Sequence, residues 1–154
     1  MSTMSKTDAN ISENKNNILI TLLASICSLG PLATDMYLPA LPQMTLDFAT
    51  TPSIIQLTLT SWLIGLAIGQ VIAGPLSDIY GRTRPLVFGL IIFTISSVAC
   101  IFAPSIELFI FARFIGGFAA SSALVVSRAI ASDIYKGTML TKFLATVMII
   151  QGLA

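Results

Sequence analysis

The charged side chains best suited to reversible chemistry lie in one short segment between two long apolar runs. Residues 74–84 read Gly-Pro-Leu-Ser-Asp-Ile-Tyr-Gly-Arg-Thr-Arg. The carboxylate of Asp78 and the guanidinium groups of Arg82 and Arg84 can form ion pairs that close in one conformation and open in another. Gly81 lets the backbone turn sharply because it has no Cβ. We therefore expect a tight turn that acts as a conformational latch.

A simpler interpretation explains only part of this segment. Loops on the cytoplasmic side of membrane proteins are rich in Lys and Arg, and that rule alone accounts for Arg82 and Arg84. It does not account for the carboxylate of Asp78, or for the glycines Gly74 and Gly81 that bracket the segment.

Two more charged residues lie inside apolar runs. Arg113 is about seven residues into its run, which places it about 10 Å from the nearer end of a helix. A guanidinium at that depth in a membrane costs a few kcal/mol, so it must face a cavity or a partner. Asp35 is the obvious anionic candidate. The alternative interpretation is that Asp35 and Arg113 form a static ion pair that only fixes helix packing.

The elements that position these residues are long and apolar. Apolar residues make up 55% of the chain and charged residues only 10%, against about a quarter charged in a soluble domain. Runs of about twenty apolar residues predict membrane-spanning helices. We therefore predict an all-α membrane protein. The predicted spans are residues 18–38, 54–76, 86–102 and 106–130, and an incomplete fifth at 143–154.

The two ends of the chain differ from this pattern. Residues 1–17 are polar and rich in Asn and Ser, which predicts a disordered tail. The last run, 143–154, is too short to cross a bilayer. We therefore expect the front portion of a longer protein, a truncated gene product or a designed piece of one.

Orientation follows from the loops. The tail and the connections after the second and fourth spans carry Lys or Arg, whereas the connections 39–53 and 103–105 carry neither. The positive-inside rule then predicts a cytoplasmic N-terminus. Tyr37 is expected near the outer boundary of the membrane, where amphipathic rings are common.

Several classes of function are disfavoured. The chain has no His and only two Cys, so a histidine-based metal site or triad is excluded. We see no nucleophile, metal cluster or phosphate loop, and we predict a protein that is not an enzyme. No basic patch suggests nucleic acid. Cys27 and Cys100 lie within spans, and we expect free thiols.

The charged segment resembles the signature of the major facilitator superfamily. That signature, G-x-L-x-D-x-x-G-R, is matched by Gly74, Leu76, Asp78, Gly81 and Arg82. The family usually has a basic residue directly after the Asp and another directly after the Arg. This chain departs from the pattern at both places, which leaves the latch recognisable but changes its charges.

A second segment is similar to bicyclomycin-resistance (Bcr/CflA-type) drug/proton antiporters. Residues 34–42 read Thr-Asp-Met-Tyr-Leu-Pro-Ala-Leu-Pro, like the end of the first helix in that group. The stretch 113–117, Arg-Phe-Ile-Gly-Gly, matches the Arg and Gly of the family's fourth helix, with Gly116 where Gln is common.

The resemblance implies a function and a larger architecture. Members have twelve helices in two six-helix halves around a cavity, so this chain would need a missing C-terminal half and would be inactive alone. It implies export of bicyclomycin- or chloramphenicol-like drugs across the inner (plasma) membrane, driven by a proton gradient without a cofactor. Asp35 would then bind and release the coupling proton, and Arg113 would adjust its proton affinity. Sodium as the coupling ion stays open.

Two residues of the second span are candidates for the substrate cavity. Trp62 lies too deep for an interfacial belt, so it either lines a drug pocket or packs between helices. Gln70 either contacts substrate or bonds a neighbouring helix. The alternative functions are a small exporter that works as a dimer of four-helix chains, and a non-transporting membrane protein or degenerate remnant.

Overall fold

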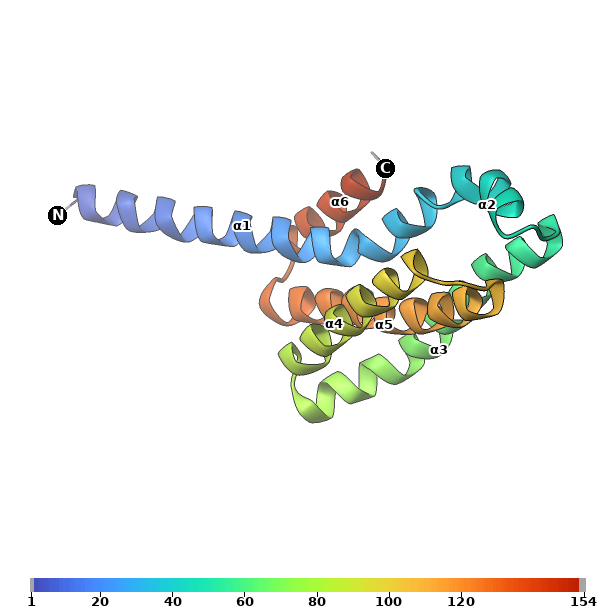
Figure 1. Cartoon of the computed structure of the whole chain (residues 1–154). Helices are drawn as coiled ribbons and strands as arrows, with labels where there is room; N and C mark the ends of the chain where they lie inside the picture. The colour runs from blue at the N-terminus through green and yellow to red at the C-terminus, as the bar shows by residue number, and fades with distance from the viewer. Residues whose placement is uncertain (1, 153–154) are drawn as a thin grey trace.

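The computed structural model is an array of helices, several of which lie side by side (Figure 1). It describes the backbone of residues 2–152 and the side chains of residues 17–152. The helices are α1 (Ser2–Asp35), the 3-10 turn η1 (Leu38–Ala40), α2 (Leu41–Asp47), α3 (Pro52–Tyr80), α4 (Thr83–Ile101), α5 (Ile106–Ile134) and α6 (Thr138–Gly152). The predicted tail, 1–17, falls almost wholly outside the described side chains and stays a prediction.

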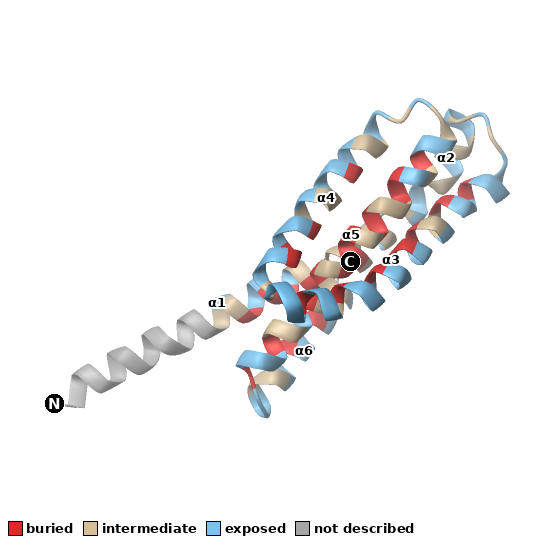
Figure 2. Cartoon of the chain, turned by 90° about the horizontal axis from the view of Figure 1, so that it is seen from below, coloured by how far each residue is buried: buried red, intermediate tan, exposed pale blue. Residues whose placement is uncertain are grey.

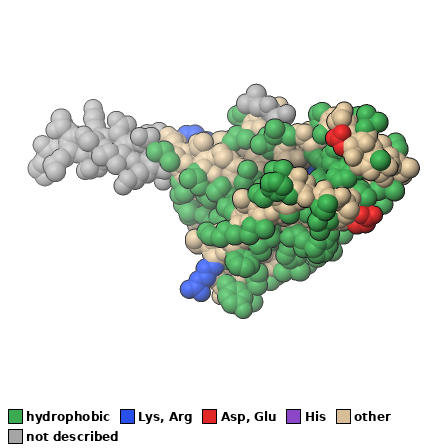
Figure 3. Space-filling model, viewed as in Figure 1, with side chains coloured by type: hydrophobic (Ala, Val, Ile, Leu, Met, Phe, Trp, Pro, Cys, Tyr) green, Lys and Arg blue, Asp and Glu red, His purple; other side chains and the backbone are tan. Residues whose placement is uncertain are grey.

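The predicted all-α membrane fold is confirmed. Four segments are long and apolar enough to cross a bilayer, namely Asn17–Asp47, Pro52–Tyr80, Thr83–Ile101 and Ile106–Ile134, and α6 is a shorter apolar helix. Hydrophobic side chains cover most of the face shown in Figure 3, with acidic patches toward one end and the larger basic patches toward the other. Such a surface suits hydrocarbon rather than water.

Helix α5 is the centre of the bundle. It packs against α3, α4 and α1, and buried positions recur along its length (Figure 2). Small residues allow this close approach. A Cβ added at Gly65 or Gly69 of α3 would overlap the carbonyl oxygens of Phe114 or Phe118, and one at Gly117 would overlap that of Trp62. Gly65, Gly69 and Gly117 therefore let α3 and α5 approach closely.

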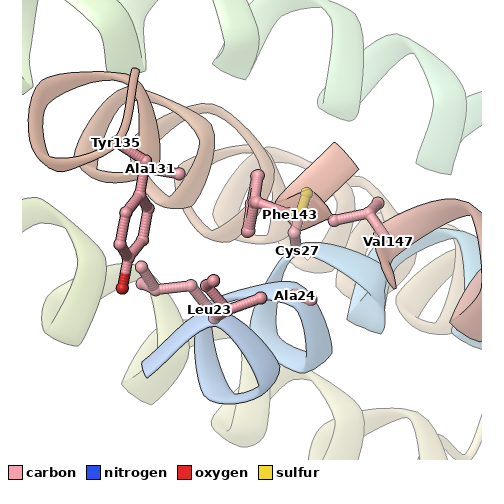
Figure 4. Packing of buried hydrophobic residues seen from close by; sticks show 8 residues of the cluster. Leu23, Ala24, Cys27, Ala131, Tyr135, Phe143 and Val147 are labelled. Atoms are coloured by element: carbon pink, nitrogen blue, oxygen red, sulfur yellow. The ribbon is translucent and has the colours of Figure 1, made fainter. Parts of the chain in front are cut away.

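A separate cluster holds α1, α5 and α6 together near the α5–α6 connection. Phe143 and Val147 of α6 pack against Leu23, Cys27 and Tyr135 (Figure 4). Beside this cluster, the ammonium group of Lys142 donates to the side-chain oxygen of Asn17 at 2.9 Å. The start of α6 is thus fixed to the first membrane-spanning helix.

The expectation of an eleven-residue turn at 74–84 was wrong in extent. Helix α3 continues through Pro75 to Tyr80, and α4 begins at Thr83, so only Gly81 and Arg82 lie between them. The reason is that backbone groups near hydrocarbon must be satisfied internally, which favours continued helix over open turn. Gly81 has φ +82°, as the sequence led us to expect of the turn residue.

Candidate functional site

The predicted ion pairing at the α3–α4 turn is present and is centred on Arg82. Its Nη1 lies 2.6 Å from Asp78 Oδ1 and also donates to Ser77 Oγ at 2.7 Å. Its Nε lies 3.0 Å from Asp133 Oδ2 at the end of α5. One guanidinium therefore connects the last turn of α3 to the last turn of α5.

Helix dipoles explain why one arginine serves two carboxylates. Asp78 and Asp133 both lie in the last turn of their helices, where the partial negative charge of the dipole disfavours an acid. Each needs a cation, and Arg82 lies at the C-terminal end of both helices. Sequence reasoning missed Asp133 as a latch residue. An acidic residue in a last helical turn was the signal that could have found it.

Arg84 does not join the latch. Among the side chains described for residues 17–152, no ion pair or hydrogen bond involves Arg84, and Arg82 alone contacts the carboxylates. Arg84 lies in the first turn of α4, and it is exposed. Of the residues expected in the latch, the structure brings together Asp78 and Arg82.

Arg113 is buried at the opposite end of the bundle, between two aromatic rings. Its side chain is on α5 and only 9% of the residue is exposed. The guanidinium carbon lies 3.9 Å from the centroid of the Tyr37 ring and 4.7 Å from that of Trp62. These distances are typical of cation–π contacts, which contribute about 2 kcal/mol when desolvated.

The structure does not pair Arg113 with Asp35. Asp35 is exposed at the end of α1, and no ion pair within 4.0 Å joins it to Arg113 in the described part of the chain. Tyr37, two residues further on, covers the guanidinium instead. The geometric expectation of an Asp35–Arg113 pair is therefore not met in this conformation, while the role of each residue in coupling stays a prediction.

Tyr37 is held in place by a hydrogen bond to α3. Its hydroxyl bonds the hydroxyl of Thr58. The hydroxyl hydrogen of Thr58 is donated to the carbonyl of Ile55 at 2.5 Å, so the Tyr37 hydroxyl is the donor. The ring also stacks on Phe109, 6.3 Å between centroids. The sequence suggested only an interfacial ring here, and nothing local indicated the contact with Arg113.

The cavity beside Arg113 has a volume of about 190 Å³. Trp62 lines it and is almost fully buried, with its ring 6.1 Å from that of Phe93 in an edge-on arrangement. The remaining lining comes from α1, α4, α5 and the segment after α1: Ala33, Tyr37, Ser96, Ser97, Cys100, Phe109, Ala112 and Gly116. Gln70 is exposed and does not line this cavity.

Comparison with known proteins identifies the family. The family model described as Major Facilitator Superfamily matches residues 22–154. The chain therefore belongs to the major facilitator superfamily, a family of membrane transporters, and is a multi-pass membrane protein. The resemblance seen in the charged signature is confirmed.

The similar relatives include drug-resistance proteins. The chain is 45% identical over 136 residues to the uncharacterized MFS-type transporter YdgK of Bacillus subtilis, which covers 88% of this chain and 34% of that protein. It is 40% identical over 118 residues to the chloramphenicol resistance protein of Pseudomonas aeruginosa, 77% of this chain and 28% of the relative. It is 31% identical over 137 residues to the bicyclomycin resistance protein homolog of Haemophilus influenzae, 89% and 34% respectively.

The chain spans about a third of the length of these curated relatives. No solved structure matches it. The predicted similarity to the bicyclomycin-resistance group is supported by the last of these relatives and by the chloramphenicol-resistance protein.

Proposed function

We propose that a full-length transporter carrying this sequence exports drug-like small molecules across the inner (plasma) membrane in exchange for protons. Family membership supports transport, and the names of the Pseudomonas and Haemophilus relatives support drugs as substrates. The N-terminus of the protein lies in the cytoplasm, because the cationic connections follow the second and fourth spans. The observation that carries the proposal is the Arg82 network, which ties α3 to α5 by contacts that can break.

The Arg82 network acts as the latch of the transport cycle. Its ion pairs are partly exposed, with 32% of the Arg82 side chain and more than half of each carboxylate accessible. Exposed pairs contribute only about 0–1 kcal/mol each. A movement of α3 against α5 therefore breaks them at a cost that a transport cycle can supply. A buried pair would hold the helices too firmly.

Proton coupling uses the opposite end of the bundle. Asp35 is exposed and unpaired with Arg113 in this conformation, so it is accessible to a proton. When α1 shifts and Tyr37 leaves the guanidinium, the Asp35 carboxylate takes the place of the ring. The attraction to Arg113 then releases the proton. Binding and release in two conformations is the minimum that exchange transport requires.

The coupling residues are tested with a full-length transporter in vesicles. Drug uptake is measured under an imposed pH gradient and, separately, under a sodium gradient. Asp35→Asn and Arg113→Ala are each expected to remove pH-driven uptake, and Glu107→Gln, an exposed acid at the same end, is expected to keep it. Full pH-driven uptake in both variants would contradict the coupling proposal. Uptake driven only by the sodium gradient would show that sodium, and not the proton, is the coupling ion.

The contribution of the missing half is tested with the chain by itself. Because the substrate cavity of this family lies between two halves, the 154-residue chain reconstituted alone is expected to show no gradient-driven uptake. Uptake by the chain alone would favour the small dimeric exporter instead.

A further inference from the structure

Two residues that line the cavity beside Arg113 carry hydrogen-bond donors with no acceptor in the described part of the chain. Arg113 Nε, Arg113 Nη2 and Trp62 Nε1 are all buried without a partner, and both residues line the cavity. Buried N–H groups are nearly always paired in folded proteins, so unpaired groups around one cavity require an explanation.

The other polar groups of the cavity do not accept hydrogen bonds from these donors. Ser96 and Ser97 donate their hydroxyl hydrogens to the carbonyl of Phe93, at 2.9 and 2.8 Å. The Tyr37 hydroxyl is committed to Thr58. No Asp or Glu is among the residues that line the cavity. The site therefore has a full positive charge and free N–H groups, but no carboxylate.

The aromatic rings do not remove this imbalance. A ring face attracts the guanidinium as a whole through its quadrupole. It accepts no strong hydrogen bond from the N–H groups, which point outward in the guanidinium plane. A small anion satisfies both needs, because it brings a negative charge and accepts several hydrogen bonds at once.

We propose that this cavity binds a small monovalent anion, a halide or a carboxylate of the size of acetate, through Arg113 Nε, Arg113 Nη2 and Trp62 Nε1. A volume of about 190 Å³ accommodates such an anion with a few waters, since one water occupies about 30 Å³ of liquid. Its lining residues all belong to the described helices and the segment after α1, and the test below measures anion binding directly, without transport.

Trp62 provides the measurement, because it is the one tryptophan of the chain. Iodide quenches indole fluorescence on contact. The chain is purified in a neutral detergent and titrated with iodide in place of gluconate at constant ionic strength. Quenching is expected to saturate, and chloride or acetate added at fixed iodide is expected to restore the fluorescence. Quenching that rises linearly with iodide and ignores chloride overturns the proposal.

Two variants locate the anion. In Arg113→Met the half-saturating iodide concentration is expected to rise by about tenfold or more, since charge-assisted hydrogen bonds are lost. Lys136→Gln removes the same charge from an exposed position outside the cavity, and its quenching curve is expected to match that of the parent chain. Equal curves for Arg113→Met and the parent overturn the proposal. Circular dichroism checks that each variant keeps its helices.

A second measurement needs no change at Arg113. Cys100 lines the same cavity, and Cys27→Ala leaves it as the one thiol. Its reaction with a sulfonate-bearing methanethiosulfonate is compared with that of the neutral ethyl analogue, each normalised to free cysteine. The anionic reagent is expected to react preferentially, and chloride is expected to slow it alone. A ratio equal to that of free cysteine, with no effect of chloride, overturns the proposal.

Discussion

Arg82 and Arg113 carry the same charge and hold it in opposite ways. Arg82 is partly exposed at the α3–α4 turn and pairs with Asp78 and Asp133. Arg113 is buried at the other end of the bundle, between the rings of Tyr37 and Trp62, and no carboxylate of residues 17–152 pairs with it. The first charge is neutralised by weak contacts that water can replace. The charge of Arg113 is neither paired nor exposed to water, so it attracts any negative group that reaches its cavity.

The contrast supports the two roles that we propose for these ends of the molecule. Exposed ion pairs are weak and reversible, which suits a contact that must open and close. A buried cation without an anion is costly, and that cost is available to drive binding of a proton-releasing carboxylate or a small anion. Four predictions sharpen or break this comparison.

The largest effect is expected from Gly117→Val, which acts on the packing that creates the Arg113 site. The new side chain would collide with the backbone of Trp62, and overpacking of this kind costs about 3 kcal/mol. The free energy of unfolding, measured in detergent with a denaturant, is expected to fall by that amount. Trp62 would move away from Arg113, seen as a shift of its fluorescence.

The control for this variant is Gly74→Ala in the same pair of helices. Gly74 lies within α3 and has open space around an added Cβ. The substitution is expected to raise stability by up to about 1 kcal/mol, because alanine favours helix. An equal loss of stability in both variants would show that close approach is not what limits position 117.

Arg113→Met is expected to stabilise the fold. In halide-free buffer the removal of a buried, unneutralised charge is expected to add about 1–2 kcal/mol to the free energy of unfolding. Chloride is expected to reduce the difference, because it stabilises the parent chain alone. Chemical denaturation with and without chloride measures both. A loss of stability larger than that of Arg82→Met would contradict the comparison.

Tyr37→Phe tests how the aromatic cover over Arg113 is positioned. The ring stays, but its hydrogen bond to Thr58 is lost, at a cost of about 1 kcal/mol. Thermal unfolding followed by circular dichroism measures the change. Tyr80→Phe is the matched control, since Tyr80 is exposed at the end of α3, and it is expected to unfold like the parent. Identical unfolding curves for the two variants would show that the hydrogen bond to Thr58 does not contribute to stability.

The smallest effect is expected at the latch. A double-mutant cycle of Arg82→Gln and Asp133→Asn is expected to give a coupling energy of about 0.5 kcal/mol in low salt, and less at about 1 M salt, because exposed charges are screened. Arg84→Gln, which removes a neighbouring charge, is expected to show no coupling to Asp133. A coupling that is unchanged by salt would mean that the pair is not exposed to water.

Much of the fold followed from hydrophobic length alone. Runs of apolar residues predicted four spanning helices and a shorter fifth, and the structure has them, with α3, α4 and α5 longer than predicted. The C-terminal end of α3 was placed too early because polar residues such as Asp78 follow the apolar run. The helix nevertheless continues to Tyr80, since backbone groups near hydrocarbon have no other hydrogen-bond partner. The G-x-x-x-G spacing of Gly65 and Gly69 is visible in the sequence, and such small-residue pairs are typical of closely packed membrane helices.

The candidate site was less accessible to sequence reasoning. Arg82 and Asp78 are four residues apart, so their pairing could be expected from helix geometry. Asp133 is 51 positions from Arg82, and only the packing of α5 between its neighbours brings it there. The same packing covers Arg113 with Tyr37 where Asp35 was expected.

The amino-acid sequence by itself determined the membrane environment, the helices and the family, because apolar runs and a charged signature are properties of residues that are close in sequence. Tertiary structure decided which charges meet. Ion pairs, cation–π contacts and unpaired donors depend on the distance between side chains from different helices. The way the helices pack places Arg113 between aromatic rings and Arg82 beside two carboxylates.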